Sequence, residues 1–185
     1  MPKKEESKLS DIEKAAKILH KGGVIIFPTD TVYGIGCKYD EPIGLGRIRH
    51  IKGSNQDLPI LVADIKQARR LANFSQTAIH LASRFWPGAL TLVLNSDKGV
   101  KIGLRIPDSD IVKSIIEKAG FPIVGTSANF HGQKAPTTFA QLDKNLIKKV
   151  DFVIKGRCKL KLESTVVDTT VDPPKVLRKG GISLQ

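Results

Sequence analysis

Short apolar runs alternate along the chain with stretches in which apolar and charged residues mix. The runs, rich in β-branched residues and bounded by Gly, Pro or Asp, predict strands at 24–27, 58–64, 89–95, 101–107, 121–127, 151–156, 163–170 and 174–180. Apolar residues at helical spacing predict helices within 9–23, 44–52, 75–86 and 108–120. Interleaved strands and helices predict an α/β fold, a twisted open mixed sheet with flanking helices.

The first predicted helix has a start and a stop signal. Ser10 stands three residues before Glu13, which is the spacing of a capping box, and Gly22 and Gly23 follow the helix. Residues 1–8 are expected to be a flexible N-terminus. A chain of 185 residues that is 41% hydrophobic is long enough for one core, so we predict a single domain over 1–185.

Charge and cysteine content limit the binding partners and the cellular compartment that we expect for the protein. The formal net charge is +12, which would attract polyanions such as nucleotides or RNA, or would simply keep a basic surface solvated. The two cysteines, Cys37 and Cys158, make no disulfide framework, and no metal-binding motif is present. Without an apolar signal segment or a run long enough to cross a membrane, we expect a cytoplasmic protein with no membrane partner.

Polar side chains follow several predicted strands, where ligands of open α/β sheets tend to bind. Such residues are also common in ordinary turns, so each group alone is weak. Arg105, between apolar residues of a strand, needs an anionic partner, which is either a ligand or a structural carboxylate. Lys52 ends a predicted helix and either complements the helix dipole or binds phosphate. Neither a Walker motif nor GxGxxG occurs, so a nucleotide site would have another design.

Seven segments in order give a more specific signal: "PTDTVYGIGC", "IKGSN..LPILV", "RFWPGALTLVL", "GLRIP", "GTSANFHGQKAPTT", "ESTVVD" and "VLRKGG". With these segments the chain resembles the YrdC family of threonylcarbamoyl-adenylate synthases from about Ser10 to Gly181. The resemblance implies a twisted α/β sheet with a basic concave face. It also implies that L-threonine, bicarbonate or CO2, and ATP with Mg²⁺ become threonylcarbamoyl-AMP and pyrophosphate. Threonylcarbamoyl-transferase proteins would then pass the product to tRNA.

The resemblance also implies roles for individual residues. Thr31, Arg105 and Ser164 would bind threonine, with two parallel hydrogen bonds from Arg105 to its carboxylate. The nucleotide would be bound by Lys52, Lys101, Ser127, Asn129, Thr137 and Arg178, and of these Lys52, Ser127 and Asn129 would also be catalytic.

One departure from the family pattern keeps a rival function open. Relatives commonly carry Lys-x-Arg where this chain has Lys52-Gly53-Ser54, and serine supplies neither the charge nor the forked geometry of arginine. Arg47, Arg49 or Lys134 are candidate substitutes. The alternative is a noncatalytic, diverged YrdC-like protein that binds RNA or nucleotide. A carbamoyl-adenylate function in hydrogenase maturation is disfavoured, since the accompanying CxxC pairs are absent.

Overall fold

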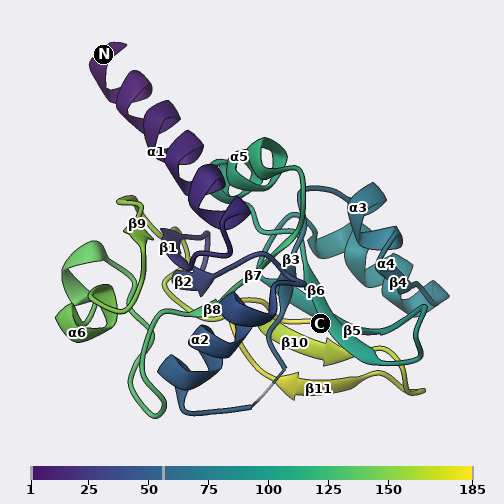
Figure 1. Ribbon diagram of the computed structural model, residues 1–185. Coiled ribbons are helices and arrows are strands. Elements are labelled where there is room, and N and C mark those ends of the chain that lie inside the picture. Colours follow the sequence, from purple (N-terminus) through teal and green to yellow (C-terminus); the bar gives the residue numbers. More distant parts are fainter. Residues whose placement is uncertain (1, 56, 185) are drawn as a thin grey trace.

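A computed structural model describes residues 2–55 and 57–184, with the backbone alone for residues 2–8 (Figure 1). The helices are α1 (Pro2–His20), α2 (Pro42–Lys52), α3 (Ile65–Arg69), α4 (Gln76–Phe85), α5 (Asp110–Ala119) and α6 (Lys144–Ile147), with a 3-10 turn at Phe139–Gln141. The strands are β1 (Ile25–Pro28), β2 (Tyr33–Gly36), β3 (Ile60–Leu61), β4 (Ala72–Asn73), β5 (Leu90–Ser96), β6 (Lys101–Arg105), β7 (Ile123–Val124), β8 (Thr126–Ser127), β9 (Phe152–Val153), β10 (Thr165–Asp168) and β11 (Lys175–Arg178).

The strands form two mixed sheets, which confirms the predicted α/β class while dividing the expected single sheet. The smaller sheet has the order β8-β2-β1-β9, and the larger runs β11-β10-β5-β6-β3-β7, with β4 paired to β5. Strands β7 and β8 are separated by Gly125 alone, so the chain passes there from one sheet to the other. A Cβ atom at Gly125 would lie 2.4 Å from a methyl carbon of Leu61, so a side chain at this crossing would clash.

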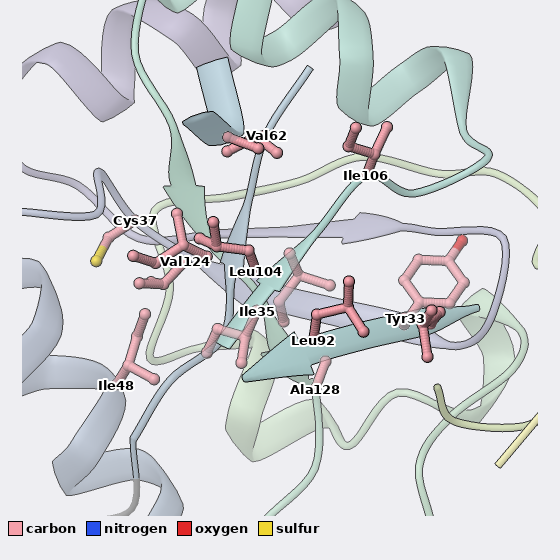
Figure 2. Close-up of a cluster of buried hydrophobic side chains, with 14 of the residues drawn as sticks. Tyr33, Ile35, Cys37, Ile48, Val62, Leu92, Leu104, Ile106, Val124 and Ala128 are labelled. Atoms are coloured by element: carbon pink, nitrogen blue, oxygen red, sulfur yellow. The ribbon is translucent and has the colours of Figure 1, made fainter. Parts of the chain in front are cut away.

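The main core lies between β2 of the smaller sheet and the central strands of the larger one. Figure 2 shows Tyr33 and Ile35 of β2 beside Leu92 of β5 and Leu104 of β6, and all four side chains are buried. Burying a large aliphatic side chain contributes about 1.5–3 kcal/mol. Because this cluster joins both sheets, it fixes their relative position and therefore any site that they share.

Helices α1 and α5 cover the opposite face of β1 with a second apolar cluster. Leu19 of α1 and Ile115 of α5 pack with Phe27 of β1, and α1 projects beyond the body of the protein (Figure 1). Because α1 begins at Pro2, the prediction that Ser10 caps its start is wrong. Lysine and glutamate are good helix formers and proline is tolerated in the first helical turn, so the charged leader continues the helix. The side chains of residues 1–8 lie outside the described residues, and their flexibility stays a prediction.

The helix predictions at 75–86 and 108–120 are confirmed, including the cap of α4. The hydroxyl oxygen of Ser75 accepts the N–H of Ala78 at 3.2 Å, and that of Ser109 accepts the N–H of Val112 at the start of α5. Strand β3 is shorter than the predicted 58–64 segment. Within the described part of the chain, no helix combines the length and the apolar character that a membrane crossing requires.

Candidate functional site

A cavity of about 600 Å³ with both polar and apolar lining is walled by residues of both sheets. The turn between β1 and β2 supplies Thr29 and Thr31, and the larger sheet supplies Lys101 and Arg105 of β6. The remaining polar lining is Asp57, Thr91, Thr126, Ser127, Glu163, Ser164, Asp168 and Arg178. Residues from seven separate parts of the sequence therefore face one space.

The stretch after β1 forms a tight turn whose hydroxyls point to one another. The hydroxyl of Thr29 donates to the carbonyl of Val32 at 2.7 Å and lies 2.8 Å from the hydroxyl oxygen of Thr31. The N–H of Thr31 donates to the Thr29 hydroxyl oxygen at 3.0 Å. These bonds satisfy the buried turn internally and hold the Thr31 hydroxyl in the cavity wall, so the segment is both a turn and a site surface.

Arg105 is almost completely buried and is held from three sides. Its Nε donates to the carbonyl of Gly88 at 2.9 Å, Nη1 donates to the Thr31 hydroxyl at 3.0 Å, and Nη2 pairs with one oxygen of Asp30. Burial lowers the pKa of the Arg105 guanidinium, and Asp30 opposes that shift. A guanidinium has five N–H donors. Because these contacts engage three, one N–H on each terminal nitrogen remains for a ligand.

Ser164 and Arg178 form a second polar cluster on the cavity wall. The Ser164 hydroxyl oxygen lies 2.9 Å from that of Thr91 and accepts a hydrogen bond from Nη2 of Arg178 at 3.1 Å. The Arg178 Nε also donates to the Ser164 carbonyl, and Nη1 lies 3.4 Å from Glu163. The arginine thus fixes the orientation of the serine hydroxyl.

Each of the three cations that line the cavity is paired with a carboxylate, but the pairs differ in burial. Arg105 with Asp30 is buried, whereas the side chains of Lys101 and Arg178 are about half exposed, at 51% and 43%. Both partners of the Arg178–Glu163 pair are exposed, and such pairs contribute only about 0–1 kcal/mol, so an incoming anion can replace Glu163 at small cost. Asp168, the partner of Lys101, is only 11% exposed, but its contact engages one of the three N–H donors of the ammonium group, so Lys101 can keep this partner and also meet an anion. Arg105 has a fixed position.

Lys52 lies against the loop after β8 rather than in the cavity lining. Its Nζ donates to the carbonyls of Ser127 and Asn129 at 2.8 Å each and to the Asn129 side-chain oxygen at 2.9 Å. Burial lowers the pKa of Lys52, and the charge of Glu163 opposes the shift. These three bonds match the three donors of an ammonium group, so Lys52 fixes the position of Ser127, which faces the cavity.

The structure therefore brings most of the predicted site residues together. Thr31, Lys101, Arg105, Ser127, Ser164 and Arg178 line the cavity, and Lys52 and Asn129 adjoin it through their contacts with Ser127 and its loop. Thr137 does not line the cavity, and its hydroxyl donates to the side chain of Gln141 at 2.9 Å. Thr29 and Thr126, polar residues that the sequence places after or at the end of predicted strands, also line the cavity, whereas the sequence interpretation missed Asp57, Thr91, Glu163 and Asp168. The acidic residue beside Ser164 and the one that ends "STVVD" were the available signals.

The candidates to replace the family arginine at Ser54 lie elsewhere. Arg47 pairs with Asp151 at 2.6 Å and donates to the carbonyl of Lys149 at 3.0 Å. Arg49 and Lys134 do not line the cavity. Lys101, Arg105 and Arg178 are thus the cations of the described cavity lining.

Among the described residues that line the cavity there is no cysteine or histidine. The Cys37 thiol is buried, and burial raises its pKa to about 12, so the reactive thiolate is not formed at neutral pH. No cluster of three or more His, Cys, Asp or Glu that could hold a metal ion occurs among residues 2–55 and 57–184. The described side chains of the cavity can align bound substrates and neutralise their negative charge.

Fold and site together define an α/β protein with a hydroxyl-lined, ion-paired cavity shared by two sheets. The chain belongs to the Sua5/YciO/YrdC family, whose model, described as telomere recombination, matches residues 17–180. It is 35% identical to a threonylcarbamoyl-AMP synthase of Pyrococcus abyssi over 94% of this chain, and it spans 55% of the length of that relative.

Two solved structures share the fold closely. P. abyssi Sua5 complexed with L-threonine has a TM-score of 0.88 and 34% identity, covering 94% of this chain and 55% of Sua5. Escherichia coli YciO has a TM-score of 0.86 and 28% identity, covering 94% of this chain and 91% of YciO. The predicted family and fold class are thereby confirmed.

Proposed function

We propose that this protein is a threonylcarbamoyl-AMP synthase, which joins L-threonine, bicarbonate or CO2, and ATP and releases pyrophosphate. The observation that supports this most is the setting of Arg105. It is a buried guanidinium with two N–H donors left over, beside the hydroxyl of Thr31, on the wall of a cavity that also has the half-exposed cations Lys101 and Arg178 in its lining. A relative with the same fold is named for this activity, and another structure of that fold contains threonine.

In the proposed reaction, the two remaining N–H donors of Arg105 hold the carboxylate of threonine and leave its amine free to react. Thr31, whose hydroxyl donates to Thr29 and accepts from Arg105, keeps the guanidinium in place and borders the bound threonine. The amine nitrogen forms a bond to the carbon of CO2 and loses a proton, which gives a carbamate. A carbamate oxygen then attacks the α-phosphorus of ATP, and the bond from that phosphorus to the bridging oxygen breaks, so pyrophosphate departs. The protein supplies alignment and charge, since no step requires an enzyme-bound intermediate.

The other cavity residues would serve the nucleotide and the remaining part of threonine. Ser164 would border the threonine pocket, Arg178 would exchange Glu163 for phosphate oxygens, and Lys101 would contact phosphate while it keeps Asp168 as a partner. Ser127 would contact the nucleotide from the loop that Lys52 and Asn129 hold in place. Thr137 would join this set only if its loop moved toward the cavity.

Mg²⁺ is expected as a companion of ATP, and the described side chains of the cavity do not form a cage for it. Both oxygens of Asp168 already accept hydrogen bonds, one from Lys101 and the other from Thr170. Since Mg²⁺ is commonly bound through substrate phosphates and water, we expect it to arrive on the nucleotide. Threonylcarbamoyl-transferase proteins would consume the product for tRNA modification in the cytoplasm, and the basic surface would allow contact with RNA.

The deciding experiment measures pyrophosphate release from ATP and magnesium, with threonine and bicarbonate each added or omitted. Release that requires both supports the synthase. The rival is a noncatalytic nucleotide- or RNA-binding protein, and Ser54 in place of the family arginine favours it. No release above background with any combination of additions, together with retained ATP or RNA binding, would establish that rival.

A further inference from the structure

A second cavity, of about 510 Å³, lies outside the candidate site, and no described residue lines both cavities. Its walls come from α3, from α4 and the two residues that follow Phe85, and from single residues after β4, after β6 and in α5. Cavities of about 300–1,000 Å³ with apolar walls and a few polar groups are typical of small-molecule sites. The proposed synthase reaction uses none of these side chains.

The walls of this second cavity are apolar and held in place. Trp86 donates its indole N–H to the carbonyl of Leu90 at 2.7 Å and meets Phe74 edge to face, with 6.1 Å between ring centroids. Ile79 and Ile106 complete the apolar wall. Because the polar atom of Trp86 is already bonded to the protein, its ring presents only an apolar surface to the cavity.

The mouth of the cavity carries positive charge. Arg69 and Lys113 are exposed there, and the nearest carboxylate to Lys113 is that of Glu117, at 3.9 Å. The single acidic lining residue, Asp64, accepts the N–H of Gln67 at 2.7 Å as the cap of α3. The described lining thus combines the exposed cations Arg69 and Lys113 with mainly apolar side chains. Its one carboxylate, that of Asp64, is bonded to the start of α3.

We propose that this second cavity binds a small amphipathic anion, with an apolar body against Trp86, Phe74 and Ile79 and an acidic group between Arg69 and Lys113. The apolar walls favour an aromatic or aliphatic body, and the rim favours a carboxylate, sulfonate or phosphate. The second cavity is connected to Arg105 through Gly88. The N–H of Gly88 donates to the carbonyl of Ile106, a residue of the cavity wall, and the Gly88 carbonyl accepts a hydrogen bond from Nε of Arg105.

The test uses two fluorescent probes of similar shape, anionic 8-anilinonaphthalene-1-sulfonate and neutral N-phenyl-1-naphthylamine. Replacing the rim cations together, Arg69→Gln with Lys113→Gln, should weaken the anionic probe about fivefold or more and the neutral probe less than about twofold. The matched control is Lys66→Gln with Arg70→Gln, which removes the same charge from exposed residues outside the lining. The control should change neither affinity by more than about twofold.

A second pair of variants tests the location without altering charge. Ser83 lines the cavity and is exposed, so Ser83→Trp should obstruct it and abolish most of the fluorescence of both probes. Thr77→Trp, on the same helix but outside the lining, is its control and should bind both probes as the original protein does. Equal effects of the rim and control pairs, normal binding to Ser83→Trp, or displacement of the probe by threonine and ATP would each overturn the proposal. None of these readouts requires synthase activity.

Discussion

Replacing Arg105 by lysine tests the proposed threonine contact, because the two side chains share a charge and differ in geometry. The guanidinium keeps Asp30, Thr31 and Gly88 as partners and has two further N–H donors. Lysine can retain the pairing with Asp30, but it cannot present two parallel donors to a carboxylate at the same time. The variant therefore removes a bidentate contact without leaving Asp30 as an unpaired buried charge.

The size of the effect follows from the contacts that are lost. A hydrogen bond to a charged group contributes about 1.5–3 kcal/mol, and at least one such bond to the threonine carboxylate disappears. The threonine dissociation constant should therefore rise by about 10- to 150-fold. ATP, whose phosphates are expected at Lys101 and Arg178, should bind within about threefold of its original affinity, since separate sites respond nearly independently.

Isothermal titration calorimetry with each ligand separately gives both constants, and thermal unfolding measures the structural cost. Equal weakening for threonine and ATP, together with a lowered melting temperature, would refute the proposed contact and indicate a structural ion pair. Should the lysine variant fail to fold, Thr31→Val provides a milder test. It removes the hydroxyl that accepts Nη1 of Arg105 and should weaken threonine about 3- to 10-fold with little change for ATP.

Three further changes test other parts of the molecule. If the missing family arginine limits turnover, Ser54→Arg should raise the rate of pyrophosphate release about tenfold, and an unchanged rate would show that the charge is dispensable. Arg47 lowers the pKa of Asp151, so Arg47→Gln should reduce the free energy of unfolding by about 0.5–1 kcal/mol at pH 7. In urea unfolding, the difference between the variant and the original protein should disappear as the pH falls below about 4, where the Asp151 carboxylate becomes protonated. Gly36→Ala would place a Cβ atom 2.0 Å from a β7 carbonyl oxygen and should lower the free energy of unfolding by about 2–4 kcal/mol. Its control, Gly46→Ala, adds a Cβ in open space on α2 and should raise that free energy by about 0.5–1 kcal/mol, and thermal unfolding measures both.

The sequence predicted those elements whose signals are local. Helices α4 and α5 begin at serine caps and carry apolar residues at helical spacing. The signals that fix the start and the end of each helix therefore lie within one segment of about a dozen residues. Strand β2 was not predicted, because its four residues "YGIG" contain two glycines and follow a polar turn. Its identity depends on pairing with β1 and, across about 90 positions of the chain, with β8. The division into two sheets is set by the same distant pairings.

For the candidate site, too, the sequence predicted residues that belong to local motifs but not the contacts between distant segments. Motif order identified Thr31, Arg105 and Ser164, which the structure places around one cavity. It did not show that Asp30, next to Thr31 in the sequence, pairs with Arg105, 75 positions away. Such a contact depends on how β6 meets the β1–β2 turn, and residue spacing holds no information about that geometry.

The pairing of cations changes how the charge of +12 is understood. Counted along the sequence, Lys101, Arg105 and Arg178 make the site strongly basic. In the structure each faces a carboxylate, and Asp57 adds a further negative charge to the lining, so the cavity walls are close to neutral. The surplus positive charge therefore lies on the outer surface, where it favours the approach of polyanions. Inside the cavity, Arg105 keeps Asp30 as its buried partner and has two further N–H donors, whereas Lys101 and Arg178 are half exposed and can turn toward an added anion.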